Sequence, residues 1–548
     1  MKPTVRKWLL AALAAVLLGA ATRFVPAINQ RRVADGLVSA PLPQAAQPSM
    51  LLGPLLAIGR APLVDFLWMR ASKLKEEGRY FDALQLAQTI GNLQPRFAAV
   101  WGFNAWNMAY NISVTFKSPE ERWRWVRNGI ELLRDQGIER NPRSVLMYKE
   151  LAWIFFHKVG QFMDDHHMYY KLQLALLMED ILGTGPEPDW EGLAAAPADW
   201  STLASDPDVQ ALAAAFQKEI GADISRPGVF LGRLADQNPS RELKALLADP
   251  KTADARRRVE LFWRAKRLRE ETKIDPARVV ALRKAYGPLD MRTADANALY
   301  WASLGTEISL GNRLALDIDK LNTDRIEVYC LQSLFRAGRL VMSPFARDGD
   351  PPMILPDVRF ADAMRRAFIA VSREYPAQPG QGPVHENFKS AFINFMRESV
   401  LRFNEAGQLD KSREYFDYLV EHYPDPIYEK GYDEFVKWQW RQVTEIVQQR
   451  DVQSRLMATL SLGVQLIAYG SEEQGAAYIA FAQRLWKQFE KEQVSDRYRL
   501  KPFPVMYEYV VHEMGKRMPE AIYERVLKRT GFKRPASTQP AADPMSLN

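Results

Sequence analysis

Helical periodicity of the apolar residues runs through most of this chain and constrains its fold more than any other feature. Leu63, Phe66, Leu67 and Ala71 recur at intervals of one to four positions on one helical face, and similar spacing continues over residues 80–90. One face of a β-strand would instead need apolar residues at alternate positions, and the sequence has no long run of β-branched residues. The pattern therefore predicts an all-α fold.

Length and composition narrow the class of protein further. A chain of 548 residues is longer than one compact core normally grows, so several domains or a repeat architecture are expected. The hydrophobic fraction of 47% and the mean hydropathy of -0.29 favour neither disorder nor a polytopic membrane protein. The 73 basic and 66 acidic residues are interspersed rather than gathered into a basic arm, so no nucleic-acid partner is expected.

The amino terminus has the pattern of an export signal. Lys2, Arg6 and Lys7 precede an apolar run over residues 8–21. Residues 1–27 are therefore predicted to be either a cleaved signal peptide or an uncleaved transmembrane anchor, and both alternatives remain open. We expect the main body to lie outside the cytoplasm, either exported or held at the membrane by this helix.

One stretch of sequence combines a glycine, small residues and a proline at a spacing typical of paired helices. Gly78 separates two helical patterns, Ala83 and Ala87 lie on the second of them, and Pro95 ends it before the chain restarts at Trp101. Glycine permits a tight turn, small residues let two helices approach closely, and proline stops a helix. This arrangement predicts antiparallel helix pairs.

The same spacing recurs elsewhere in the chain. Further copies begin with an aromatic residue on a first helix or contain the glycine turn and second helix, namely Tyr148, Leu151, Ala152 and Phe155; Trp301, Leu304, Gly305 and Ile308; Gly407, Leu409, Ser412, Phe416, Leu419 and Pro424; and Gly470, Gly475 and Ala482. Internal similarity of this kind indicates a repeat protein.

These copies resemble the tetratricopeptide repeat, and the whole arrangement resembles uncharacterised membrane-anchored members of that superfamily. The resemblance covers about half of the chain. It implies a right-handed superhelical solenoid of helix pairs, which the long insertions would make irregular or divide into two halves. It supplies no enzymatic activity.

Breaks in the periodicity, rich in proline, glycine or alanine, set the expected domain boundaries. We expect an anchor at 1–27, a tether at 28–50, helix pairs at 51–182, an insertion or hinge at 183–240, a central helical region at 241–343, a Pro/Gly-rich segment at 344–384, further helix pairs at 385–530 and a disordered tail at 531–548.

One cluster of residues could carry metal chemistry. His157, Asp164, Asp165 and His166 lie close together in the sequence, and imidazoles and carboxylates can hold zinc or another divalent cation. Their spacing is not that of two ligands on one helical face. The alternative interpretation is a junction between helices whose aspartates cap the second helix. Cys330 is the only cysteine and is expected to be a buried, inert thiol.

The first helices of the predicted pairs supply a candidate binding surface. Repeats of the family that the chain resembles generally bind ligands on the concave side, which the first helices line, and the corresponding positions here are Trp68, Lys75, Trp106, Tyr110, Lys149, Trp153 and Phe156. Aromatic rings and lysines together suit an extended peptide or the tail of a partner protein. The alternative is that these aromatic residues are covered and belong to the core.

Two functions are compatible with these observations. The first is a membrane-anchored or exported protein-protein interaction scaffold without catalytic activity or a cofactor. The second is a metal-dependent hydrolase or transferase that uses the cluster of His157, Asp164, Asp165 and His166. The first accounts for the anchor, the tether and the repeats together, and we expect it to be the function.

Overall fold

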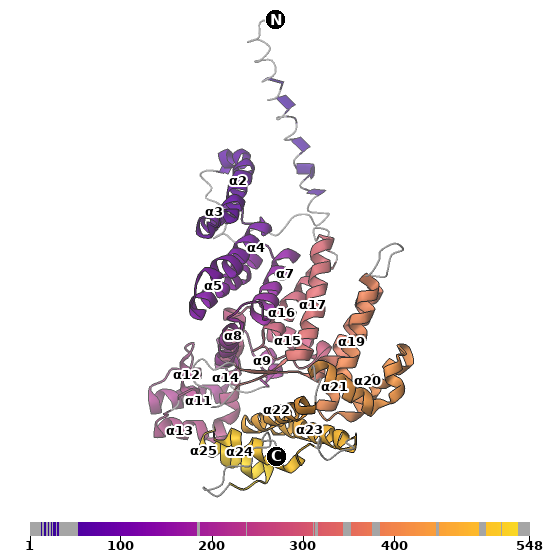
Figure 1. Ribbon diagram of the computed structural model, residues 1–548. Coiled ribbons are helices and arrows are strands. Elements are labelled where there is room, and N and C mark those ends of the chain that lie inside the picture. The colour runs from indigo at the N-terminus through magenta and orange to yellow at the C-terminus, as the bar shows by residue number, and fades with distance from the viewer. Residues whose placement is uncertain are drawn as a thin grey trace. The chain divides into compact units, whose positions relative to one another are not determined.

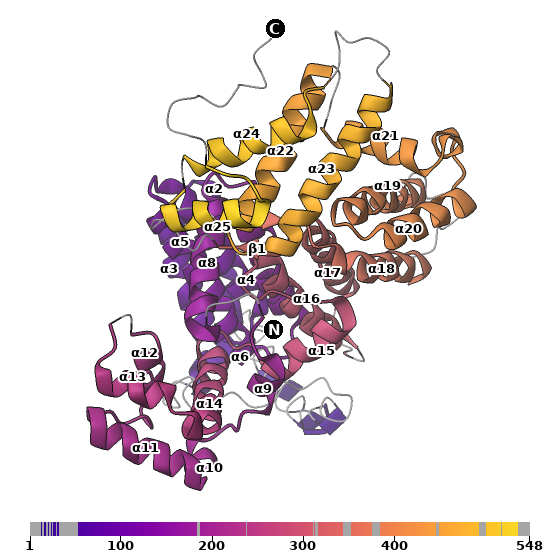
Figure 2. The same cartoon turned by 90° about the horizontal axis from the view of Figure 1, so that it is seen from below.

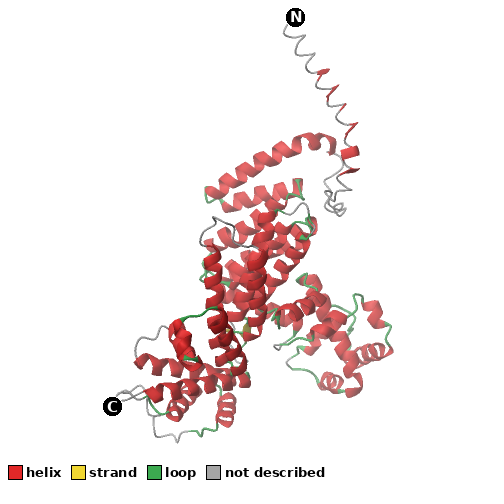
Figure 3. Cartoon of the chain, turned by 90° about the vertical axis from the view of Figure 1, so that its right-hand side faces the viewer, coloured by secondary structure: helices red, strands yellow, loops and turns green. Residues whose placement is uncertain are grey.

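The computed structural model is helical almost throughout the residues it describes (Figure 1), which confirms the predicted all-α class. Strands account for two short segments of this part of the chain, and Figure 3 shows how little they contribute. The described residues are 53–183, 187–236, 238–310, 312, 316–342, 352–374, 384–444, 449–492, 500–516 and 518–534, together with scattered positions between 12 and 31.

The chain divides into two compact units. The first takes in the chain up to Leu174 together with Gly192–Pro276 and Ala294–Cys330. The second takes in Ala175–Glu191, Ala277–Thr293 and the chain from Leu331 onward.

In the described part of the first unit, every secondary-structure element is a helix. Its elements are α2 (Gly53–Glu76), α3 (Tyr80–Leu93), α4 (Ala98–Trp106), η3 (Asn107–Ile112), η4 (Ser113–Thr115), α5 (Pro119–Glu131), η5 (Leu132–Gly137), α6 (Ile138–Arg140), α7 (Val145–Trp153), η6 (Ile154–Gly160), α10 (Trp200–Ala204), α11 (Pro207–Ile220), α12 (Val229–Leu234), α13 (Arg241–Ala248), η7 (Pro250–Thr252), α14 (Ala253–Glu271) and α16 (Ala294–Ser309).

The second unit contains both short strands. Its elements are β1 (Arg339–Val341), β2 (Met353–Leu355), η8 (Val358–Phe360), α18 (Ala361–Glu374), α19 (Val384–Glu405), α20 (Leu409–His422), η9 (Pro426–Lys430), α21 (Tyr432–Thr444), α22 (Gln449–Ala468), α23 (Glu472–Glu492), α24 (Phe503–Gly515) and α25 (Glu520–Thr530). Four helices contribute residues to both units, namely α8 (His167–Leu182), α9 (Trp190–Ala195), α15 (Pro276–Tyr286) and α17 (Asp317–Ala337).

Three helical hairpins turn at glycines that the sequence singles out. Gly78 joins α2 to α3, Gly407 joins α19 to α20, and Gly470 joins α22 to α23, with φ of 75°, 75° and 84°. The residue after each glycine donates its N–H to a carbonyl five positions back, as Arg79 does to Leu74 at 2.9 Å. This is a Schellman cap, and its left-handed position favours glycine.

The paired helices of these hairpins approach closely at small residues. Ser412 Oγ donates to the carbonyl of Val400 on the facing helix at 2.6 Å. A Cβ atom at Gly475 would lie 2.6 Å from the carbonyl oxygen of Gly463. These pairs lie at the same positions relative to their turns, seven residues before the glycine and five after it.

A recurring hydrogen bond relates the start of α4 to the start of α7. Trp101 Nε1 donates to the carbonyl of Pro95 at 2.9 Å, and the Tyr148 hydroxyl donates to the carbonyl of Pro142 at 2.9 Å. In both cases the aromatic residue lies six positions after the proline. The two helices therefore begin in the same register, as the sequence predicts.

Helix α7 packs along α16, although about 150 residues separate them in sequence. Gly305 of α16 makes this possible, because a Cβ atom there would lie 3.0 Å from Cβ of Tyr148 and 3.2 Å from Cγ2 of Thr323. The Trp301 ring lies 6.4 Å from the Tyr148 ring.

Helices α10 to α14 form a small group with their own apolar core (Figure 2). Leu212, Phe216 and Phe230 pack there with Phe262 and Trp263 of α14. The boundary expected at residue 240 falls inside this core, which joins residues on both sides of it. The reason is that α14 supplies the apolar face that the short helices before residue 240 need to bury.

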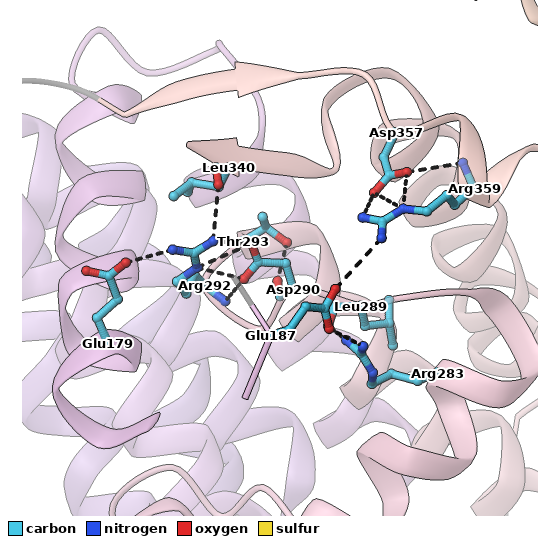
Figure 4. A network of polar contacts seen from close by, with 10 residues as sticks. All are labelled: Glu179, Glu187, Arg283, Leu289, Asp290, Arg292, Thr293, Leu340, Asp357 and Arg359. Carbon is cyan, nitrogen blue, oxygen red and sulfur yellow. Dashed lines mark hydrogen bonds and ion pairs between the residues drawn. The ribbon is translucent and has the colours of Figure 1, made fainter. Parts of the chain in front are cut away.

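A network of ion pairs holds the separate chain segments of the second unit together (Figure 4). The Arg292 side chain, 7% exposed, contacts Glu179 at 2.7 Å and Asp290 at 2.8 Å and donates to the carbonyl of Leu340 at 3.1 Å. Glu187 contacts Arg283 at 2.5 Å. The network anchors β1, which pairs with β2 in antiparallel register.

Most of the predicted anchor at 1–27 and tether at 28–50 lies outside the described residues, as does the tail beyond residue 534. None of the helices in the described part of the chain is both long enough and apolar enough to span a membrane.

Candidate functional site

A chain of aromatic rings follows the first helices of the first unit. We call it the aromatic track and define it by seven residues: Trp68, Phe103, Trp106, Tyr110, Trp153, Phe156 and His157. Each lies half-buried or exposed at the surface. Trp68 contacts Phe103, and Trp106, Tyr110, His157, Trp153 and Phe156 contact one another in that order, with Lys75 between the two groups.

The track begins on α2 and α4, where a lysine lies between aromatic rings. The Trp68 ring lies 5.0 Å from the Phe103 ring, edge to face. Lys75 Nζ lies 5.4 Å from the Phe103 ring centre and 5.3 Å from the Trp106 ring centre. Aromatic faces attract cations, so these contacts hold the Lys75 ammonium at the surface of the track.

Two stacked pairs occupy equivalent positions on α4 and α7. Trp106 and Tyr110 stack with ring centres 4.4 Å apart, and Trp153 and His157 stack with ring centres 4.9 Å apart. The two members of each pair lie five and nine residues after Trp101 or Tyr148, the first aromatic residue of α4 or α7. Because the backbone registers match, the pairs repeat the same surface feature.

Both helices change to a π-helix within these pairs. The π-helices η3 and η6 begin six residues after Trp101 and Tyr148, and they carry Tyr110 and His157. The Tyr110 hydroxyl lies 3.3 Å from His157 Nδ1, so the two π-helices place the equivalent residues in contact. π-Helices are rare and occur often at functional sites.

The track ends where η6 approaches α17. The Phe156 ring lies 5.8 Å from the Trp153 ring and stacks on the Tyr329 ring at 5.9 Å. Tyr329 is 43% exposed and Trp106 is 37% exposed, so this surface is open to water at both places. Rings that are needed only for packing are normally covered more completely.

Six of the seven residues predicted for the binding surface lie on or beside this track. Lys149 is the exception, because its ammonium contacts Asp319 at 2.9 Å and Glu150 at 3.0 Å. Burial opposes the charge, but the two carboxylates outweigh it and raise the pKa of Lys149. The expectation that this lysine is available to a ligand carboxylate is therefore not met.

A buried ion pair fixes the loop that follows the track. Lys158 Nζ lies 2.5 Å from Asp164 Oδ2. The backbone N–H of His166 and the hydroxyl of Tyr170 donate to Asp164 Oδ1 at 2.9 Å and 3.1 Å. Burial works against the carboxylate charge, but the hydrogen bonds led by Lys158 outweigh burial and lower the pKa of Asp164.

The structure does not bring the predicted metal-binding cluster together. Asp164 points inward to Lys158, His157 lies in the aromatic track, and Asp165 is exposed. Within the described ranges, no three side chains of histidine, cysteine, aspartate or glutamate lie where they could share a metal ion. Asp164 instead accepts hydrogen bonds at the start of α8, as the alternative interpretation of a capping aspartate expects.

His157 has the environment of a neutral imidazole. Burial lowers its pKa, and the nearby positive charge of Lys158 lowers it further. Burial also raises the pKa of Tyr110, and Glu150 adds to this effect. The pair therefore presents an uncharged, polar contact at the centre of the track.

Sequence reasoning missed three residues that shape this surface. Phe103 belongs to the track, Tyr329 stacks on its last ring, Phe156, and Lys158 Nζ lies 5.4 Å from the Tyr110 ring centre. The sequence does contain a signal for Lys158, because a lysine among the mostly apolar residues 154–159 indicates a buried charge that needs a partner. Tyr329 has no such signal, because its contact with Phe156 joins distant parts of the chain.

Comparison of the chain with protein-family models, with curated proteins and with solved structures finds no match.

Proposed function

We propose that this chain is a non-catalytic interaction scaffold, membrane-anchored or exported, which binds an extended segment of a partner protein along the aromatic track. The proposal includes a right-handed, irregular solenoid of tetratricopeptide-like helix pairs. Glycine turns, close contacts at small residues and matched aromatic-proline hydrogen bonds support this architecture.

One observation carries the proposal: the stacked pairs Trp106–Tyr110 and Trp153–His157 lie at equivalent positions and at the surface. A surface feature that repeats along a series of helices suits a ligand that is itself extended, because each pair can contact a successive part of the ligand. Rigid aromatic rings supply contact area at little entropic cost.

Charge adds a preference for acidic groups in the ligand. Lys75 is held over two rings by cation–π contacts, and a ligand carboxylate could approach it from solvent. The polar pair of Tyr110 and His157 can exchange hydrogen bonds with a peptide backbone. No catalytic role is included, because Lys158 already neutralises Asp164, the one buried carboxylate of the predicted cluster.

Selection from a displayed library of unstructured peptides against the full chain tests this proposal. We expect Trp106→Ala and Trp153→Ala each to weaken binding of the selected peptides by about 2 kcal/mol, roughly 30-fold in Kd. The unfolding midpoint should not change. Lys75→Glu should weaken the binding of acidic peptides more than that of other peptides. Phe81→Ala, at an exposed ring of α3, and Lys218→Glu, at an exposed lysine of α11, are matched controls.

Two results would overturn the proposal. One is selected peptides whose affinity does not respond to any track variant. The other is a loss of folding in Trp106→Ala and Trp153→Ala while Lys75→Glu leaves binding intact, which would mean that the rings pack and do not bind. Cell fractionation tests the location separately, and full-length protein found wholly in the cytosol would contradict export or anchoring.

A further inference from the structure

The outer face of α2 exposes large apolar side chains. Leu63, Phe66 and Met69 are 40%, 61% and 64% exposed, and their spacing of three residues places them in one band along the helix. The opposite side of α2 is buried, where Val64, Ala71 and Leu74 pack within the first unit. Helix α2 is thus apolar on two faces, of which the first unit covers one.

Of the described helices α2, α3, α4 and α7 of this unit, α2 lies at one end of the series (Figure 1). Its extensive contacts are with α3. The end helix of such a series normally presents a polar outer face, because water meets it directly. An apolar outer face at this position indicates that another apolar phase covers it.

Basic residues continue the same band. Arg70 and Lys73 follow Met69 on the outer side of α2, and both are exposed. Residues 53–76 carry four basic and two acidic side chains. Apolar side chains bordered by arginine and lysine suit the boundary between acyl chains and anionic headgroups, where the cations remain with the phosphates.

We propose that the outer face of α2 lies on an anionic phospholipid bilayer, with Phe66 and Met69 entering the headgroup region. Trp68 and Lys75 lie on the other side of the helix, within and beside the aromatic track. Membrane contact and ligand binding therefore use different faces of α2. The inference shares the membrane location of the proposed function but does not depend on the track binding a peptide.

A single fluorescent label on the full chain tests this. Cys330 is fully buried, so an introduced surface cysteine is the accessible thiol. Phe66→Cys carries an environment-sensitive nitrobenzoxadiazole label, and Lys218→Cys on α11 carries the same label as the control. We expect vesicles of phosphatidylcholine and phosphatidylserine to shift the emission at position 66 to the blue and to leave position 218 unchanged.

The charge contribution has its own variant. Arg70→Glu with Lys73→Glu should remove most of the shift at position 66, and so should added salt. No shift at position 66 would overturn the proposal, and an equal shift on phosphatidylcholine alone would overturn its anionic part. If the emission at position 66 instead shifts without vesicles, and more at higher protein concentration, a second copy of the chain covers the outer face of α2. Binding of selected peptides to the same labelled chain reports separately on the track.

Discussion

Lys158 Nζ lies 2.5 Å from Asp164 Oδ2, and each side chain is 5% exposed. The pair joins η6 to the loop that precedes α8, so it fixes the end of the π-helix that carries His157. Arg122 approaches the same carboxylate at 3.5 Å from α5. Asp164 thus links η6, which carries His157 of the aromatic track, to α5.

Removing one partner of this pair should destabilise the first unit. We expect Lys158→Met to lower the free energy of unfolding by about 3 kcal/mol, because it leaves Asp164 buried and only partly compensated. Urea denaturation measures the loss. Lys158→Met combined with Asp164→Asn should lose less than Lys158→Met alone. Arg124→Met, which removes an exposed ion pair with Glu121, should change stability by less than about 1 kcal/mol.

The same carboxylate should make stability depend on acidic pH. Because the pKa of Asp164 is lower in the folded chain than in the unfolded chain, its contribution is present above the unfolded value of about 3.9. It is lost as the pH falls through the folded pKa. The stability difference between the natural chain and Asp164→Asn should therefore shrink on acidification below about pH 4. A difference that grows there would contradict the assignment.

A larger residue at position 305 should force α16 away from its neighbours. Gly305→Leu should destabilise by about 1 to 3 kcal/mol, because even a Cβ atom would lie 3.0 Å from Tyr148. Thermal unfolding checks this. Gly232→Ala in α12 is the matched control, since nothing lies within 4 Å of its Cβ position, and it should be neutral or slightly stabilising. Equal effects of the two variants would contradict the close packing.

The recurring parts of the fold could be predicted because local chemistry determines them. Gly78, Gly407 and Gly470 occupy left-handed positions that other residues adopt only with strain. Trp101 and Tyr148 follow a proline at the same distance, and the hydrogen bonds confirm their common register. This common register also sets the positions of Trp106, Tyr110, Trp153 and His157 in the aromatic track.

Contacts between distant residues could not be predicted in this way. Lys149 pairs with Asp319, which lies 170 positions away, and nothing near either residue indicates the other. The π-helices η3 and η6 also have no local signature, yet they place Tyr110 against His157. The metal hypothesis treated Asp164 as an available ligand because closeness in sequence does not reveal the Lys158 contact.

Arg292, 7% exposed, should contribute more to stability than Arg283, which is 20% exposed. We expect Arg292→Ala to cost about 3 kcal/mol, because Glu179 and Asp290 are mostly buried and would lose their shared cation. Arg283→Ala should cost less than about 1 kcal/mol, since its partner Glu187 is 49% exposed. Hydrogen exchange at β1 should accelerate in Arg292→Ala alone. Equal acceleration in both variants would mean that Arg292 does not anchor the strand.

His157 should titrate below the usual histidine range and make ligand binding depend on pH. Burial and the charge of Lys158 lower its pKa, so NMR titration should find it below about 6.5. Folding stability should fall as the pH decreases from that unfolded value toward the folded pKa, because protonation favours the unfolded chain.

A peptide on the track would shield His157 from water still further, so binding should weaken as the imidazole takes up a proton. His157→Phe keeps an aromatic ring beside Trp153 and should retain binding at neutral pH while losing this pH dependence. If binding to His157→Phe weakens on acidification as much as binding to the natural chain, the proton is taken up elsewhere and His157 is not part of the contact.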